Sequence, residues 1–467
     1  MKKIFIVMCM VAGLISCTSE YFTHQEETAA SVPMQFDIKV AGNTDTKATK
    51  ESWAKGDKIY VFFNGLATKY LVLTYNGSTW SNASGGGTLQ TSDFSKLSTK
   101  TLTAVHFPVA VDVAYADNQF FFTKGGKPVY NYYLFQSGKS YEVSGTTVSA
   151  TLSMGKPDGM AQFHVAGIQS SVANYTFGCS KVKPVACKSV GTDGAIIEDV
   201  LQAGARLSGI ADSDGAIFAG RLTKPGVSTD YTFTLATDSK IYTMNRTGKT
   251  LTAGKMYNFS STYYWSSTDA SSLYVDLGLS VLWANGNLGA TSNTEYGSYF
   301  AWGELQSKKN NNFDWDHYYF GGSPTKYNEN DNIYTLQPED DAAYAALGGK
   351  FRMPTRTEWA ELCNTDNCNW EWKTNYNGSG KNGFLVTSKK ANYTSKSIFL
   401  PAAGKSSVTS SQGSYCYYWS SSLESSGSYR VTNAYATCAY YENNTIQAYP
   451  IRDERYYGLS IRPVRVK

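Results

Sequence analysis

The sequence predicts a mainly β protein with several domains, and three observations support this prediction. The chain has 467 residues, which corresponds to about three domains of ordinary size. Aromatic residues make up 14% of the chain and charged residues only 17%, a bias typical of strand-rich, surface-displayed proteins. Short runs of alternating apolar residues recur between turn signals, beginning with Gln35 to Val40, where Phe36, Ile38 and Val40 share one face.

The charge balance argues against one class of partner. Lys and Arg number 42 and Asp and Glu number 38, which gives a formal net charge of +4. No basic block stands out, so nucleic acid is not expected as a partner. The hydrophobic fraction of 42% is sufficient for well-packed cores.

Residues 1–17 have the features of a lipoprotein signal peptide. Lys2 and Lys3 precede an apolar run that is short for a membrane span. The run ends in Leu14-Ile-Ser-Cys17, which resembles the bacterial lipobox and predicts lipidation of Cys17. The alternative is an ordinary signal peptide with an incidental cysteine. Residues 18–34 are polar, lack periodicity, and are expected to form a tether.

The next strands are expected to form a sandwich. Lys58 to Phe63 is apolar on both faces, as a central strand requires. Tyr70 to Tyr75, Asn76-Gly77 and Ser78 to Ser81 predict a hairpin with a type I′ turn. Further short strands are expected at Ala104 to Val109, Gln119 to Thr123 and Val148 to Leu152.

An ordered set of motifs in this half resembles the fimbrillin family of pilus subunits. The motifs are A-T-K-x-x-W-x-x-G-D-x-I-x-V-F, then Y-N-G-S-T-W, then Ala161 to Ala166, and then Leu251 to Phe259. The resemblance implies two tandem transthyretin-like β-sandwiches, at residues 35–156 and 157–262. The Ser- and Thr-rich residues 263–272 are then expected to be a linker.

The resemblance also implies a mode of assembly. In fimbrillins a protease removes the first strand, and a strand from a neighbouring subunit fills the vacated groove. The departing strand here is Phe36 to Val40. The break after it contains Lys47 and Lys50, the candidate processing sites, but no Arg, so a Lys-cleaving or broad trypsin-like protease is required. The alternative is that the strand stays in place.

Local rules predict two short helices in residues 273–467. Thr355 and Glu358 form a capping box, with Trp359, Leu362 and Cys363 on one buried stripe. Upstream, Pro338 and three following acids start a helix that stops at Gly348-Gly349.

Seven ordered motifs frame these helices. They are Leu273-Tyr-Val-Asp-Leu-Gly-Leu-Ser-Val-Leu-Trp283, Tyr299-Phe-Ala-Trp-Gly-Glu304, FRMPTRTEW, Trp370-Glu-Trp372, Phe399-Leu-Pro-Ala-Ala-Gly404, Tyr418-Trp-Ser-Ser-Ser422 and Gly458-Leu-Ser-Ile-Arg-Pro-Val464. Together they resemble C-type-lectin-like domains found in surface lipoproteins. The resemblance implies an α+β fold for residues 273–467 in which LYVDLGL pairs with GLSIRPV. The final segment would be consumed in that sheet, leaving no obvious donor strand.

The polar residues do not indicate catalysis, a metal or a cofactor. No zinc ligand spacing occurs, and the calcium triplets of calcium-dependent lectins are missing. Asp314, Asp316 and His317 are interpreted as a polar surface turn, and Asn328 to Asn332 as a solvated loop. For the cysteines, proximity in sequence favours Cys179 with Cys187, Cys363 with Cys368, and Cys416 with Cys438. Buried free thiols are the alternative.

Three aromatic-rich runs remain as candidates for ligand recognition, because Tyr, Trp and Arg bury large areas and offer polar groups. They are Phe313 to Phe320, Tyr415 to Tyr418 and Arg452 to Tyr457. The candidate residues are Trp315, Tyr318, Tyr319, Tyr417, Arg452 and Tyr456. The same rings would equally serve to pack long loops on a small core.

The sequence therefore predicts a non-enzymatic pilus tip adhesin. It would begin as an outer-membrane lipoprotein precursor, assemble with other pilus subunits at the cell surface, and bind a glycan or protein. The alternatives are a surface lipoprotein that does not polymerise and a pilus anchor subunit.

Overall fold

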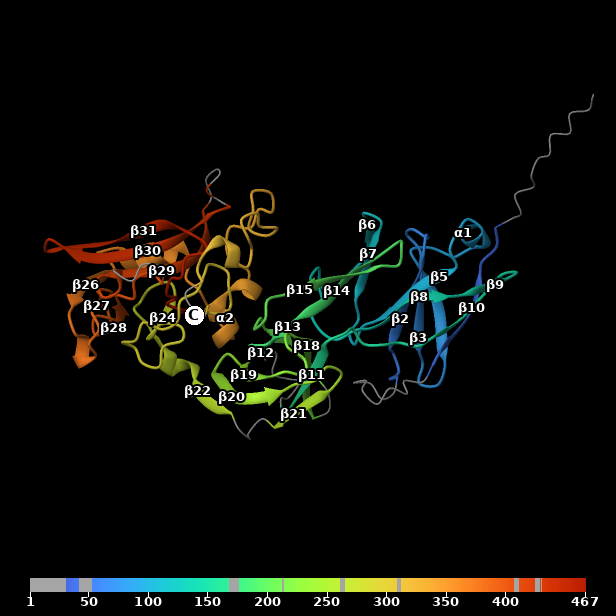
Figure 1. Cartoon of the computed structure of the whole chain (residues 1–467), viewed down its shortest axis with the longest axis horizontal. Helices are drawn as coiled ribbons and strands as arrows, with labels where there is room; N and C mark the ends of the chain where they lie inside the picture. The colour runs from blue at the N-terminus through green and yellow to red at the C-terminus, as the bar shows by residue number, and fades with distance from the viewer. Residues whose placement is uncertain are drawn as a thin grey trace, which may run out of the picture.

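The computed structural model describes residues 31–41, 53–167, 176–211, 214–260, 265–308, 312–406, 411–424, 429 and 431–467. The fold is mainly β and multidomain, and Figure 1 shows three parts in a row, with the N-terminal part at one end and the C-terminal part at the other. Within the described residues, no helix is both long and apolar enough to cross a bilayer.

The N-terminal sandwich packs a five-stranded sheet against a three-stranded one. The first has the order β4-β3-β2-β5-β8 and the second β1-β10-β9. Their bounds are β1 (Gln35–Val40), β2 (Lys58–Phe63), β3 (Tyr70–Tyr75), β4 (Trp80–Gly85), β5 (Thr101–His106), β8 (Leu134–Ser140), β9 (Glu142–Ser144) and β10 (Thr147–Leu152). A single helical turn, α1 (Thr91–Phe94), follows β4.

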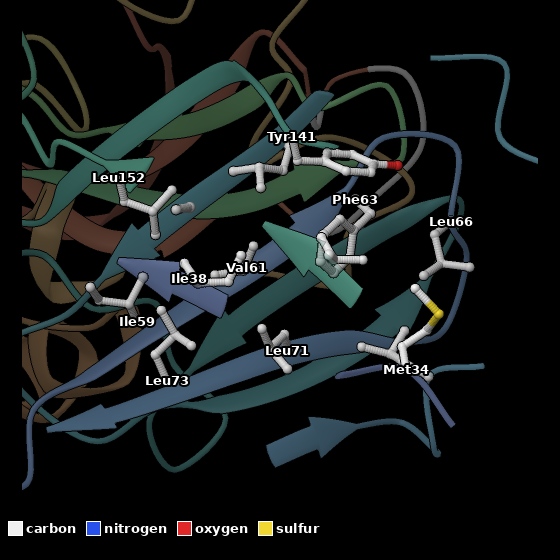
Figure 2. Packing of buried hydrophobic residues seen from close by; sticks show 14 of the residues in the cluster. Met34, Ile38, Ile59, Val61, Phe63, Leu66, Leu71, Leu73, Tyr141 and Leu152 are labelled. Atoms are coloured by element: carbon white, nitrogen blue, oxygen red, sulfur yellow. The ribbon is translucent and has the colours of Figure 1, made fainter. Parts of the chain in front are cut away.

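The core between these sheets confirms the predicted faces of β1 and β2. Ile38 is buried, Phe36 and Val40 pack beside it, and all three meet the Ile59, Val61 and Phe63 face of β2. Figure 2 shows Ile38 close to Val61 and Ile59. The other face of β2 belongs to a second core, so this strand is apolar on both sides because both sides are covered.

The hairpin of β3 and β4 is confirmed, but the predicted type I′ turn is wrong. Tyr75 pairs with Trp80, so the loop has four residues, and only Gly77 has a positive φ, of 109°. The Asn76 side chain accepts hydrogen bonds from the amides of Ser78 (2.9 Å) and Thr79 (2.8 Å). This Asx turn shapes the loop without a positive φ at Asn76.

A four-stranded sheet crosses the predicted boundary at residues 156 and 157. Its order is β15-β14-β7-β6, with bounds β6 (Asp112–Ala116), β7 (Gln119–Thr123), β14 (Val185–Gly191) and β15 (Ile196–Val200). β7 pairs with β14, with Phe121 opposite Ser189. Phe120 and Phe122 share a core with Val185 and Val190. Chain segments from both sides of Pro157 are thus joined by main-chain pairing in one sheet.

The middle sandwich has two five-stranded sheets around one core. One contains β11 (Met160–Ala166), β13 (Val182–Lys183), β17 (Ile210–Ala211), β18 (Gly215–Leu222) and β21 (Met256–Ser260). The other contains β12 (Thr176–Cys179), β16 (Leu207–Ser208), β19 (Ser228–Ala236), β20 (Lys240–Thr250) and β22 (Ser266–Asp269). The predicted linker 263–272 is corrected in part, because β22 pairs with β20, with Ser267 opposite Tyr242.

In its described residues, the C-terminal domain combines three small sheets with two α-helices. The sheets are β23-β24-β32-β25, β26-β27-β28 and β29-β30-β31. The strand bounds are β23 (Tyr274–Val275), β24 (Leu282–Ala284), β25 (Phe351–Arg352), β26 (Cys368–Lys373), β27 (Gly383–Ser388), β28 (Ser397–Pro401), β29 (Tyr415–Leu423), β30 (Asn433–Glu442), β31 (Thr445–Glu454) and β32 (Val464–Arg465). The helices are α2 (Ala342–Leu347) and α3 (Arg356–Cys363), with 3-10 turns η1 (Ala270–Leu273), η3 (Trp315–His317), η4 (Pro338–Asp340) and η5 (Tyr376–Gly378).

The closing pairing of this domain differs from the expectation. β32 lies between β24 and β25, with Val464 opposite both Trp283 and Arg352. β23, in the LYVDLGL segment, pairs with β24 and forms no hydrogen-bonded ladder with the last strand, β32. The closing segment is therefore held on two sides by strands other than the one expected.

The two helix starts follow the predicted capping chemistry. The Thr355 hydroxyl accepts from the Glu358 amide (3.2 Å), and the Glu358 carboxylate accepts from the Thr355 amide (2.8 Å). Trp359 and Leu362 are fully buried, whereas Cys363 is only partly buried. The Pro338 turn is a 3-10 helix, and α2 starts behind it at Asp341, whose side chain accepts from the Tyr344 amide.

Candidate functional site

The three aromatic-rich runs meet on one surface of the C-terminal domain. We call the aromatic face the group of Trp315, Lys405, Tyr417, Tyr456 and Tyr457. The Trp315 and Tyr456 ring centroids are 5.0 Å apart with an interplanar angle of 63°, and those of Tyr456 and Tyr457 are 4.6 Å apart. Lys405 Nζ lies 4.6 Å from the Tyr417 centroid and 5.0 Å from that of Tyr457. The lysine thus bridges two tyrosines of different runs by cation–π contacts.

Strand alternation extends this surface along the β29-β30-β31 sheet. Tyr415 and Tyr417 are two residues apart in β29 and share a face, with centroids 5.8 Å apart. Tyr415 is opposite Tyr440, with centroids 5.2 Å apart, and Tyr449 of β31 lies 6.4 Å from Tyr440. Tyr449 is 41% exposed. The alternate residues of β29, Cys416 and Tyr418, point into the core instead.

Burial and nearby charges keep the hydroxyls of Tyr417 and Tyr456 protonated and hold Lys405 in position. Lys405 forms an ion pair with the buried Asp453. Burial raises the pKa of Asp453, and the Lys405 ammonium opposes that shift. Burial also raises the pKa of Tyr417 and, together with a hydrogen bond to Glu454, that of Tyr456. The surface therefore presents hydroxyl groups beside apolar ring faces, an arrangement suited to binding either a glycan or a protein.

Three of the predicted ligand residues do not belong to this face. Tyr318 is only 4% exposed, and its hydroxyl donates to the Trp302 carbonyl (2.8 Å). Its ring packs against Trp315 from the buried side, with centroids 5.6 Å apart. Arg452 Nε lies 2.7 Å from the Glu424 carboxylate, which is 1% exposed. The positive charge of Arg452 therefore compensates the buried negative charge of Glu424. Tyr319 is 51% exposed but lies in a separate cleft.

Two members of the aromatic face were not singled out from the sequence. Tyr457 was only part of a run, although its neighbour Tyr456 was predicted. Lys405 follows a Pro-Ala-Ala-Gly turn and carries no local signal, because its role depends on Asp453 and Tyr457, about fifty residues further along the chain. Trp315, Tyr417 and Tyr456 are the predicted residues that the structure brings together.

All six cysteines in the described part of the chain are unpaired. Cys179 and Cys187 lie in different cores, and Cys416 and Cys438 point to opposite faces, because Cys438 is paired with Tyr417. The structure therefore contains neither of these two disulfides, because Cys179 and Cys187 belong to different cores and strand alternation turns Cys416 and Cys438 to opposite faces. Cys363 and Cys368, at the end of α3 and the start of β26, are also free. Burial raises the pKa of every one of these thiols.

The polar side chains predicted to lie on turns accept hydrogen bonds from nearby backbone amides. Asp314 caps η3 by accepting from the His317 amide (2.9 Å), which confirms a surface turn. Asp331, in the Asn328 to Asn332 loop, accepts from the amides of Asn328 (3.1 Å) and Ile333 (2.9 Å). No group of three or more His, Cys, Asp or Glu side chains within the described ranges is arranged to hold a metal ion. Cys17, Lys47 and Lys50 lie outside the described residues.

No family model matches the chain, and no curated protein matches it. Among solved structures, it is similar to a fimbrial protein from Bacteroides ovatus (10% identity, 92% of this chain and 99% of that one, TM-score 0.24). It is also similar to the fimbrial anchor protein Mfa2 from Porphyromonas gingivalis (13% identity, 44% and 78%, TM-score 0.23). A third is a candidate cell adhesion protein from Bacteroides ovatus (12% identity, 52% and 96%, TM-score 0.26). TM-scores this low do not establish a shared fold.

Proposed function

We propose that this chain is a fimbrial subunit at the end of a filament, a tip adhesin whose C-terminal domain binds a surface ligand. The proposal is based on a contrast between two strands. β1 lies at the edge of its sheet and pairs only with β10 among the described residues, whereas β32 is paired on both sides. A neighbouring subunit could therefore replace β1 without disturbing the rest of its sheet, whereas β32 cannot be replaced in this way.

β1 has the properties of a strand that a neighbouring subunit could replace. Its ladder to β10 is parallel and runs over six residues, from Gln35 opposite Thr147 to Val40 opposite Leu152. Ile38 is its one fully buried side chain. An incoming strand with the same alternation would restore both the ladder and the core contact, which is β-strand addition. The partners would be other pilus subunits.

The segment around β32 is unsuited to being donated to another subunit. Besides its two ladders, it includes Arg462, which is completely buried and donates to the carbonyls of Ala284 (3.0 Å) and Phe399 (2.7 Å). Withdrawing this segment would leave those acceptors unpaired in the core, at a cost of about 1–3 kcal/mol each. A subunit that accepts a strand but keeps this segment fits a terminal position.

The test of the filament role is the N-terminus of this chain in purified fimbriae, determined by mass spectrometry. The expected N-terminus is Ala48 or Glu51, after cleavage at Lys47 or Lys50, without Phe36 to Val40. A variant carrying both Lys47→Gln and Lys50→Gln should be exported but absent from filaments. An intact acylated Cys17 in assembled material would contradict the proposal.

The aromatic face is the proposed ligand surface. Trp315→Ala and Tyr456→Ala should each reduce binding of fimbriated cells to their target surface, because each removes a ring from the same cluster. Tyr441→Ala is the control, since Tyr441 is an exposed ring (41%) of the same domain that stacks on Trp372 instead. Equal adhesion of all three variants and the parent would contradict this part of the proposal.

A second candidate is a lipoprotein that does not polymerise or a pilus anchor, acylated at Cys17 and retained in the outer membrane. The observation that favours it is β1 itself, which is folded in place and completes its core. Such a protein would keep β1 for its whole life. The N-terminus found in purified fimbriae distinguishes the two candidates.

A further inference from the structure

A cleft lies where all three parts of the molecule meet. Its volume is about 490 Å³, within the range of about 300–1,000 Å³ usual for small-molecule sites. Tyr130 comes from the segment before β8 of the N-terminal sandwich, and Asp199 from β15 of the four-stranded sheet that joins the first two sandwiches. Tyr319, Phe320, Lys326 and Glu339 come from the C-terminal domain. We call it the three-domain cleft. Tyr319 is one of the three predicted recognition residues that do not belong to the aromatic face.

The walls of the three-domain cleft are fixed by contacts across the domain boundaries. The Tyr130 hydroxyl donates to Asp199 (2.5 Å). Lys326 Nζ donates to Glu339 (2.8 Å) and to the buried Asp340 (2.6 Å). Gln202, in the segment between β15 and β16, also donates to Asp340 (2.9 Å). The polar groups are therefore held in position before any ligand arrives, which reduces the ordering cost of binding.

The lining combines ring surface with alternating acceptors and donors. Tyr319 is 51% exposed and stands nearly perpendicular to Phe320, with centroids 5.0 Å apart. Burial and the nearby carboxylates raise the pKa values of Tyr130 and Tyr319, so both phenols stay neutral. The carboxylates of Asp199 and Glu339 can accept from ligand hydroxyls, and Lys326 can donate to a ligand oxygen.

These features match a saccharide better than a purely apolar or an anionic ligand. A pyranose ring has an apolar C–H face that packs on an aromatic side chain, and a rim of hydroxyls that both donate and accept. An anion would face the carboxylates of Asp199, Glu339 and Asp340, with only Lys326 to balance them. An apolar ligand would leave these polar groups without partners.

We propose that the three-domain cleft is a saccharide-binding site, with Tyr319 as the stacking ring and Asp199 and Glu339 as hydroxyl acceptors. This site is separate from the aromatic face and does not depend on the filament role. Because its walls come from three domains, a bound saccharide would also hold those domains together.

The test is binding of the methyl glycosides of glucose, galactose, mannose and N-acetylglucosamine to the mature full chain, by saturation-transfer NMR and calorimetry. At least one glycoside should bind saturably. Tyr319→Ala should weaken it by about tenfold or more, whereas Tyr319→Phe, which keeps the ring, should retain most of the affinity. Asp199→Asn should also weaken it, because the amide is a poorer acceptor.

The controls separate this site from the aromatic face and from misfolding. Tyr441→Ala should leave glycoside affinity unchanged, and Tyr319→Phe reports binding even if Tyr319→Ala does not fold. Saturable binding of none of the four glycosides would overturn the proposal. So would unchanged affinity in a folded Tyr319→Ala variant, or loss of affinity in Trp315→Ala alone.

Discussion

β1 of the N-terminal sandwich and β32 of the C-terminal domain differ in how they are held. β1 has one hydrogen-bonded neighbour among the described residues, and Asn82 adds a single side-chain hydrogen bond to the Phe36 carbonyl (3.3 Å). β32 has two neighbours, and the segment before it contributes the buried Arg462 and two bridges, Phe300 with Leu459 and Tyr418 with Ser460. One strand is at an edge, while the other is part of a core.

This difference shows that the same chain can contain a replaceable strand and a permanent one. Edge strands can pair with another chain, because one row of their backbone groups has no ladder partner. A strand between two others, attached to buried polar groups, can leave only if the domain unfolds. Substitutions in each region should therefore differ in size and in what they disrupt.

The largest effect is expected from Arg462→Leu. Arg462 is fully buried and also donates to the Asn287 side chain (2.9 Å), so its loss leaves three buried acceptors unpaired. We expect a loss of at least about 3 kcal/mol in the stability of the C-terminal domain, measured by urea unfolding. Arg356→Leu, at an exposed position in the same domain, should cost less than about 1 kcal/mol. If both variants lost the same stability, the segment around Arg462 would not be held in place by its buried contacts.

Ile38→Ala should have a smaller effect, confined to the N-terminal sandwich. Removing a buried isoleucine from β1 should cost about 2–4 kcal/mol in calorimetric unfolding of that part. The neighbouring Lys39→Ala is the control, because Lys39 is exposed and should change stability by less than about 0.5 kcal/mol. If Ile38→Ala also lowered the stability of the C-terminal domain, the two strands would not be independent.

Asp341 gives the C-terminal domain a pH dependence. Burial raises its pKa to about 6, although hydrogen bonds from the Tyr344 and Met353 amides oppose this shift. Since the unfolded value is about 3.9, the folded protein retains a proton between about pH 4 and 6 that the unfolded chain has lost. This contribution to stability is fully present below pH 4 and falls, by up to about 3 kcal/mol, as the pH rises through 6.

The variant Asp341→Asn removes this titration. Measured by urea unfolding at several pH values, its stability relative to the parent should therefore increase from pH 4 to pH 7. A constant difference across this range would contradict the account of Asp341.

The smallest effect is expected from Thr355→Ala at the start of α3. It removes the hydroxyl that caps the Glu358 amide and should cost about 1 kcal/mol in urea unfolding of the C-terminal domain. Thr355→Ser keeps the cap and should be nearly neutral. A cost for Thr355→Ala as large as that for Arg462→Leu would show that the two regions are not distinguished by burial.

The sequence predicted the features that depend on neighbouring residues. The capping box of Thr355 and Glu358 and the two-faced pattern of β2 are local, and both are confirmed. The Asn76-Gly77 turn was wrong, because the Asn76 side chain offers the backbone an alternative that the residue types alone do not exclude.

Features that depend on distant pairing were missed. Nothing near β7 or β14 indicates that they pair across the predicted boundary, since the pairing is decided by their shared core. For the aromatic face, the run around Trp315 predicted the right kind of side chain. Because that run has no regular period, the sequence did not separate the surface ring Trp315 from the buried Tyr318 and from Tyr319 in the three-domain cleft.

Native-state hydrogen exchange tests the contrast between the two strands most directly. The backbone amides of β1 that bond to β10 should open with a much lower free energy than those of β24 and β32, because an edge strand can detach without global unfolding. We predict that β1 amides exchange through a local opening, while β32 amides exchange only when the C-terminal domain unfolds. Protection of β1 equal to that of the central strand β2 would contradict the account.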